Sequence, residues 1–170
     1  MPHKQHQRSV SLQTYLTALP GYGYRNQGTV VATDGSLRTR KHTSGEMSMG
    51  AGIAAGDGDL RLSFRVGGQF SSTRSELVAI VLALRTMEQV QTLFILVDCA
   101  TALQRLAWCR SRKFCPSLRK IKDVDVMHDI MTLTRMRQDV GRATTFVKVH
   151  GHSGDPLHSV SDPSGKGAAC

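Results

Sequence analysis

Three acidic residues stand where distant parts of the chain can bring their carboxylates together. Asp34 follows the apolar stretch at residues 29 to 33, and Asp98 follows the apolar run "TLFILV". If both runs are neighbouring strands of an open α/β sheet, their carboxyl ends border the crevice where ligands bind. Glu76 adds a third acid in the first turn of the helix expected between them. Carboxylates crowded in this way repel each other unless a hard divalent cation such as Mg²⁺ binds them, so we predict a metal site.

Each of these acids also has a purely structural explanation. Asp34 precedes a Gly-Ser pair and can begin a turn. Glu76 completes a capping box with Thr73. Asp98 can cap the helix that follows its strand. The local sequence alone leaves both explanations open for each residue.

The stretch "HGHSGDPLHSVSD", residues 150 to 162, is a second candidate site near the end of the chain. Its ionisable side chains are His150, His152, Asp155, His158 and Asp162. Imidazole suits Zn²⁺ better than Mg²⁺, so a zinc cage is one interpretation. A polar surface loop and one corner of the acidic site are the others.

The composition favours a single domain that binds a polyanion. A chain of 170 residues is long enough for one core, and we assign residues 1–28 to a tail or linker and 29–170 to the domain. The formal charge of +9 suits nucleic acid, although a basic protein without such a partner is the alternative. No apolar run is long enough for a membrane span and no signal-peptide core is present, so we expect an intracellular protein, cytoplasmic or nuclear.

The cysteines argue against a thiolate zinc site. They show no CxxC spacing and are too few to cross-link a chain of this length, so we expect reduced thiols. They are Cys99, Cys109, Cys115 and Cys170.

Hydrophobic periodicity predicts a mixed α/β fold. Strands are expected at residues 29–33, 49–55, 60–66, 92–98 and 144–149, and helices at 73–90, 101–108 and 123–138. Short connections make the first three strands antiparallel neighbours, whereas helical crossovers make the last two parallel. The expected architecture is one mixed five-stranded sheet with helices on both faces.

Several motifs, taken in this order, resemble the ribonuclease H family of the type 1 and retroelement kind. They are "TDGS", "GAGI", "SSTRSELVAIVLAL", "LVDCATAL", "VKVHGHSGDPLHSVSD" and the closing "DPSGKGAA". The resemblance covers roughly residues 29 to 169. The sequence departs from the family pattern in two motifs. His158 and Ser159 replace the usual Asn and Glu, and Gly165 stands where Ala is usual.

The resemblance implies a ribonuclease H-like fold and an endoribonuclease that cuts the RNA strand of RNA:DNA hybrids. It assigns Asp34, Glu76, Asp98 and Asp162 to the binding of two Mg²⁺ ions, for which Mn²⁺ is a substitute. Cleavage would leave a 5′-phosphate and a 3′-hydroxyl. His152 would assist proton movement or product release, a role suited to a side chain with a pKa near neutrality. The histidine-rich stretch is thereby divided between a helper and a ligand.

The resemblance also implies the substrate contacts. The backbone around Gly35 and Ser36 and the pair Ser72 and Thr73 would read the 2′-hydroxyls that distinguish RNA from DNA. The basic segment from Arg105 to Lys122 would contact phosphates without regard to sequence, and a merely solvated basic face is its alternative.

The biological setting follows from the basic tail that runs directly into the domain. We expect a monomer taken from a retroelement polyprotein, downstream of a reverse transcriptase. A stand-alone cellular type 1 enzyme and a catalytically inactive nucleic-acid-binding module are the alternatives. A transposase-like nuclease is disfavoured, because such relatives draw their final acid from a late helix.

Overall fold

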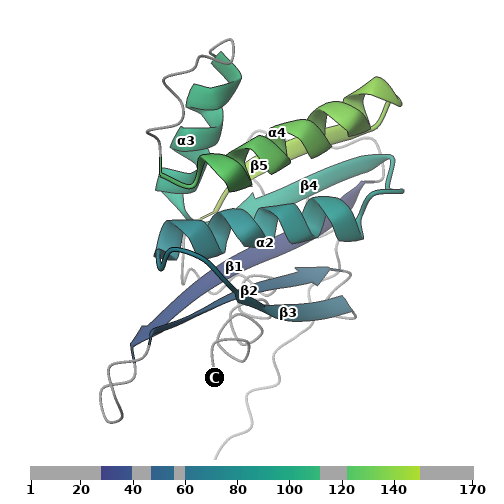
Figure 1. Ribbon diagram of the computed structural model, residues 1–170. Helices are drawn as coiled ribbons and strands as arrows, with labels where there is room; N and C mark the ends of the chain where they lie inside the picture. Colours follow the sequence, from purple (N-terminus) through teal and green to yellow (C-terminus); the bar gives the residue numbers. More distant parts are fainter. Residues whose placement is uncertain (1–27, 40–46, 56–59, 112–121, 150–170) are drawn as a thin grey trace, which may run out of the picture.

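The computed structural model of the protein describes residues 28–39, 47–55, 60–111 and 122–149 (Figure 1). Three strands come first, then helices alternate with the two remaining strands. The elements are β1 (Thr29–Thr39), β2 (Met47–Ala55), β3 (Leu60–Val66), α2 (Ser72–Thr86), β4 (Thr92–Val97), α3 (Ala100–Ser111), α4 (Val124–Asp139) and β5 (Ala143–Lys148).

The strands form one mixed sheet in the order β3-β2-β1-β4-β5. β2 pairs antiparallel with both β1 and β3, whereas β1–β4 and β4–β5 are parallel. This confirms the predicted sheet, three antiparallel strands followed by two parallel ones. Helices α2, α3 and α4 cover one face of it (Figure 1). No described helix lies on the opposite face, and residues 150–170 are not among those described.

The core lies between the sheet and these helices. Val31, Ile53 and Ile95 come from three adjacent strands and are fully buried. Ile80 of α2 and Ile130 of α4 pack against the same cluster. Burying an aliphatic side chain of this size contributes about 1.5 to 3 kcal/mol, so the face covered by helices supplies much of the stability.

The first strand is longer than its apolar stretch predicts. Asp34, Gly35 and Ser36 continue β1 and pair with Gly52, Ala51 and Gly50 of β2. The interpretation of Asp34 as the start of a turn is therefore wrong. Gly-Ser suggests a turn in an isolated sequence, but here the partner strand supplies the ladder that keeps the segment extended.

Helix α2 ends earlier than predicted, at Thr86 rather than near residue 90, because a buried arginine binds the carbonyls that follow it. Arg137 of α4 is 3% exposed and uses all five guanidinium N–H groups. They donate to the carbonyls of Met87 (2.7 Å), Glu88 (3.0 Å), Val90 (2.7 Å) and Ala143 (3.2 Å) and to Thr144 Oγ1 (2.8 Å). A cation at this end also complements the dipole of α2.

Two further findings bear on the expected class of protein. Within the described part of the chain, no helix is long and apolar enough to cross a membrane. Cys99 and Cys109 are free thiols, as expected, whereas Cys115 and Cys170 lie outside the described residues.

Candidate metal centre

Three carboxylates from separate parts of the chain converge at one point of the sheet. One oxygen each of Asp34, Glu76 and Asp98 lies within 4.8 Å of the others. Asp34 and Glu76 are only 7% and 8% exposed, and Asp98 is half-buried. The structure thus brings together the three acids proposed from the sequence that fall within the described residues.

The two aspartates meet because the pairing of β1 with β4 ends just before Asp34. β1 and β4 pair from Thr29 and Leu93 up to Ala32 and Leu96, after which only the pairing of β1 with β2 continues. The Thr33 hydroxyl donates to the Leu96 carbonyl over 2.9 Å at the point of separation. Asp34 follows directly on one strand, and Asp98 follows the end of the other. Such a point, where adjacent connections leave the sheet in opposite directions, is where open α/β sheets bind ligands.

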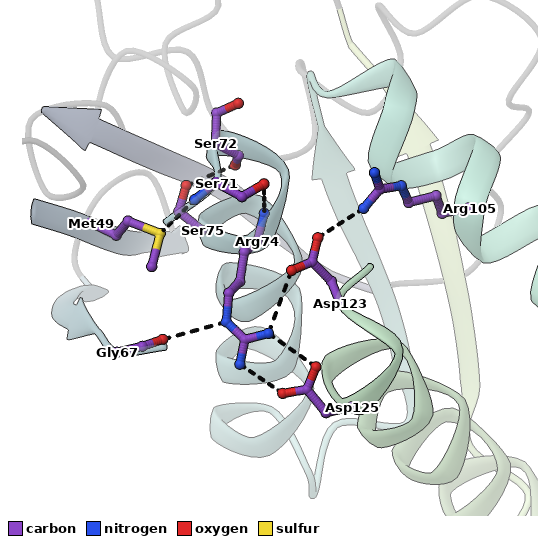
Figure 2. Close-up of polar contacts among 9 residues, drawn as sticks. All are labelled: Met49, Gly67, Ser71, Ser72, Arg74, Ser75, Arg105, Asp123 and Asp125. Atoms are coloured by element: carbon purple, nitrogen blue, oxygen red, sulfur yellow. Dashed lines mark hydrogen bonds and ion pairs between the residues drawn. The ribbon is translucent and has the colours of Figure 1, made fainter. Parts of the chain in front are cut away.

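Glu76 is positioned by a helix that begins one turn before it. The N-cap of α2 is Ser71, whose hydroxyl accepts the N–H of Arg74 at 3.3 Å (Figure 2). The Ser71 N–H in turn donates to Met49 Sδ at 3.1 Å, which fixes this end of α2 on β2. The predicted capping box of Thr73 with Glu76 is therefore wrong, because Thr73 lies inside the helix. Capping does not explain why an acid stands at position 76.

Cys99 stands directly before the helix that follows Asp98. α3 begins at Ala100, and the sulfur of Cys99 accepts the backbone N–H groups of Thr101 and Ala102. Burial raises the pKa of the Cys99 thiol, so the cap is a neutral side chain. Cys99 thus binds the first N–H groups of α3 from the position directly before the helix.

Gly35 lets the strand carrying Asp34 approach the helix carrying Glu76. A β-carbon at Gly35 would overlap the backbone nitrogen of Glu76 and would lie 2.7 Å from Ser75 Oγ. The Gly35 N–H donates to the Glu76 carboxylate. Glycine is therefore required here for close approach.

The neighbouring carboxylates give the site a negative electrostatic potential. Burial, followed by the charges of Asp98 and Asp34, raises the pKa of Glu76 to about 9. The Gly35 N–H and the charge of Lys148 act in the opposite direction and are weaker. Among the described residues no donor reaches the buried Oε2 atom of Glu76. A buried carboxylate oxygen without a donor, on a residue whose carboxylate lies close to two others, fits a hard divalent cation that takes oxygen ligands.

Lys148 is a member of the site that the sequence did not predict. It is the last residue of β5 and stands opposite Val97 in the parallel pairing with β4. Its ammonium group donates to the backbone carbonyls of Asp98 (2.6 Å) and Val149 (2.5 Å). One feature of the sequence could have indicated Lys148. It is a basic residue at the carboxyl end of a predicted strand that lies parallel to the strand ending at Asp98.

The other proposed site residues are placed as follows. Gly35 and Ser36 lie on β1 beside the acids, and Ser72 and Thr73 are the first two residues of α2. His152 and Asp162 lie outside the described residues, together with the rest of the histidine-rich stretch.

The basic segment begins with a residue that has an acidic partner. The Arg105 guanidinium donates to Asp123 at 2.8 Å. Residues 112–121 of this segment are not among those described.

The sequence matches the family model of RNase H over residues 26–165. The chain belongs to the RNase H family. None of the curated proteins matches it. Solved structures show the same fold in this family. The solution structure of the prototype foamy virus (PFV) RNase H domain has a TM-score of 0.65 and 17% identity, covering 84% of this chain and 94% of that one.

Two other structures extend the comparison. The protease-reverse transcriptase of prototype foamy virus has a TM-score of 0.63 and 15% identity over 84% of this chain, which spans only 21% of the viral protein. LC11-RNase H1 in complex with an RNA/DNA hybrid has a TM-score of 0.57 and 14% identity, covering 84% of this chain and 99% of that one. At these identities the likeness shows the fold.

Proposed function

We propose that this protein is a metal-dependent endoribonuclease that hydrolyses the RNA strand of RNA:DNA hybrids. The observation that carries the proposal is the convergence of Asp34, Glu76 and Asp98, two of them buried, in a chain of the RNase H family. The turn explanation for Asp34 and the capping box of Glu76 do not hold in the structure. The similar LC11-RNase H1 was solved with an RNA/DNA hybrid bound, which supports the same class of substrate here.

We further propose that the domain comes from a retroelement polyprotein. Its support is the similarity to a foamy virus protein in which the corresponding domain is joined to a protease and a reverse transcriptase. The basic tail at residues 1–28 is the stretch through which such a connection would run.

The three described carboxylates would hold the metal, with Asp162 as the proposed fourth ligand. Two Mg²⁺ ions, or Mn²⁺ in their place, would activate the attacking water and stabilise the leaving 3′-oxygen of an in-line displacement. Glu76 is protonated at neutral pH without a cation, so it must give up its proton to become a ligand. The Gly35 N–H orients its carboxylate, and Lys148 holds the backbone of Asp98.

Substrate recognition is assigned to the start of α2 and to the adjacent strand. The hydroxyls of Ser72 and Thr73 and the backbone at Gly35 and Ser36 are proposed to contact the 2′-hydroxyls of the RNA strand. The lysine and arginine side chains that give the chain its net charge of +9 would bind the phosphates of both strands without regard to sequence.

The test is cleavage of a labelled RNA:DNA hybrid by Asp34→Asn and wild-type protein in Mg²⁺, with EDTA as the metal-free control. We expect Asp34→Asn to abolish cleavage, because a neutral amide is a poor ligand, while circular dichroism shows an intact fold. Asp139→Asn is the matched control, since Asp139 is exposed at the end of α4, and should cleave normally. Near-normal cleavage by Asp34→Asn would contradict the metal site.

A substrate panel separates the remaining alternatives. Wild-type protein should cut the hybrid and leave duplex RNA and duplex DNA intact. Binding of the hybrid without cleavage in Mg²⁺ would identify an inactive nucleic-acid-binding module instead. Equal cleavage of duplex DNA would indicate a different nuclease of the same fold.

A further inference from the structure

A buried aspartate outside the metal site connects three helices. Asp123 precedes α4, its side chain is 0% exposed, and its backbone is left-handed, with φ of 64° (Figure 2). Its two carboxylate oxygens take separate partners: Oδ1 lies 3.4 Å from Arg74 of α2, and Oδ2 lies 2.8 Å from Arg105 of α3. A left-handed conformation is uncommon outside glycine, and it persists where the surrounding contacts determine it.

Arg74, Arg105, Asp123 and Asp125 form an ion cluster. Arg74 makes several contacts in it. Its guanidinium makes a two-pronged pair with Asp125, at 3.0 and 2.7 Å, in addition to the contact with Asp123. Its Nε donates to the Gly67 carbonyl at 3.4 Å. The first turn of α2 is thereby fixed to the start of α4 and to the turn after β3.

The cluster includes one residue from the helix that carries Glu76 and one from the helix that follows Asp98. Arg74 stands two residues before Glu76 in the same helix. Arg105 belongs to α3, the helix that begins two residues after Asp98. Asp123 therefore bridges the helix of one ligand to the helix that follows the other, without touching either ligand.

We propose that Asp123 is a positioning residue that sets the separation of Glu76 and Asp98 by bridging Arg74 to Arg105. The inference rests on the proposed metal site. A carboxylate is suited to this role because it accepts a charged hydrogen bond on each oxygen, and such bonds are about twice as strong as neutral ones. Burial keeps solvent from competing for the bridge.

Asp123 and Asp125 provide a matched pair of variants. Both carboxylates bind Arg74, but Asp125 is 63% exposed and, within the described part of the chain, forms no ion pair with Arg105. Asp123→Asn keeps the shape of the side chain and the tolerance for a left-handed backbone, and removes the charge that bridges the helices. Asp125→Asn removes the same charge from Arg74 and leaves the bridge intact.

The experiment measures Mn²⁺ affinity of the full 170-residue chain by electron paramagnetic resonance of the free ion. We expect Asp123→Asn to weaken Mn²⁺ binding about tenfold, the lower end of the effect seen for groups that orient metal ligands. Asp125→Asn should change it less than about twofold, because an exposed ion pair contributes little. Equal affinity of folded Asp123→Asn and wild-type protein would overturn the proposal, because a merely structural role lowers stability without moving the metal affinity.

Arg105→Met provides the second test if Asp123→Asn does not fold. The Arg105 side chain is 28% exposed, and its loss breaks the bridge while Arg74 still pairs with both aspartates. Weaker Mn²⁺ binding by this variant supports the proposal, and unchanged binding refutes it. The readout also separates the two proposals: wild-type protein that binds Mn²⁺ without cutting hybrid refutes the nuclease function alone. Wild-type protein that binds no Mn²⁺ refutes both.

Discussion

Gly35 and Glu76 are in contact so close that no side chain fits between them. A β-carbon on Gly35 would overlap the Glu76 nitrogen, and the Gly35 N–H donates to the Glu76 carboxylate. One residue thus provides both the space for the helix and a hydrogen bond that orients the acid. The contact joins β1 to α2 at the point where Asp34 and Glu76 must meet.

Gly35→Ala should therefore damage the site and the fold together. The added methyl group must push α2 away from β1, which we expect to cost about 1 to 3 kcal/mol of unfolding free energy, the usual range for overpacking. Cleavage of hybrid should fall by at least about tenfold, because misplaced ligands bind metal poorly. Urea denaturation and the cleavage assay measure the two effects. Gly67→Ala is the control and should be near wild type, since among the described residues no atom beyond its chain neighbours lies within 4 Å of the place its β-carbon would take.

Glu76→Gln should change how stability depends on pH in the absence of metal. The pKa of Glu76 is about 9 in the folded protein and about 4.5 unfolded, so the folded state binds more protons between these values. Wild-type stability should fall as pH rises through this window, and the neutral amide removes that fall. Urea denaturation in EDTA should show the variant to be the more stable at about pH 8, with a smaller difference at about pH 5. A difference that does not change with pH would contradict the assignment.

Arg137→Met should destabilise the protein without altering its chemistry. The substitution keeps an apolar stem and removes one donor from each of four carbonyls. The Glu88 carbonyl keeps Arg142 as a donor and the Met87 carbonyl keeps the Val90 N–H. We expect a loss of about 1 to 3 kcal/mol, because hydrogen bonds to a charged group contribute about 1.5 to 3 kcal/mol each and two of the acceptors retain a partner. Arg135→Met is the control, because Arg135 is exposed on the same helix. At low temperature, where Arg137→Met remains folded, its Mn²⁺ affinity should equal that of wild-type protein.

His152→Ala should reduce turnover without abolishing it. The side chain is proposed to move a proton or to release product, so the carboxylates would still support slow cleavage. Steady-state cleavage of hybrid, with Mn²⁺ binding measured alongside, checks this. Complete loss, or no effect at all, would show that the auxiliary role is misassigned.

The local alternation of apolar and polar residues is sufficient to predict most strands of the sheet, because this alternation involves only residues close together in the sequence. β3 is predicted at residues 60 to 66 and lies there, since its apolar and polar residues alternate along the whole strand. The prediction for β1 is too short because Asp34, Gly35 and Ser36 are residue types that favour turns. Their extended conformation depends on β2, which the local sequence does not represent.

The acids of the site can be found from their position at strand ends, but their neighbours cannot. Thr73 resembles a helix cap because Ser71, Ser72 and Thr73 can all cap, and only the Ser71 contact with Met49 of β2 selects among them. Lys148 acts through a backbone carbonyl 50 residues away in sequence. Asp123 and Arg137 likewise escape prediction, because the value of a buried charge depends on partners brought together only by folding.

The pairing of β1 with both β2 and β4 also determines when the metal site can form during synthesis of the chain. The strand meets β2 through a short connection, but its other neighbour, β4, is synthesised only after β3 and α2. Ribosomes add roughly 5 to 20 residues per second, so Asp34 is made several seconds before Asp98. A nascent chain can complete the β1–β2 hairpin and still have no place for a cation. Metal binding would therefore report that the central parallel pairing of β1 with β4 has formed, which makes Mn²⁺ a probe of that long-range step of folding.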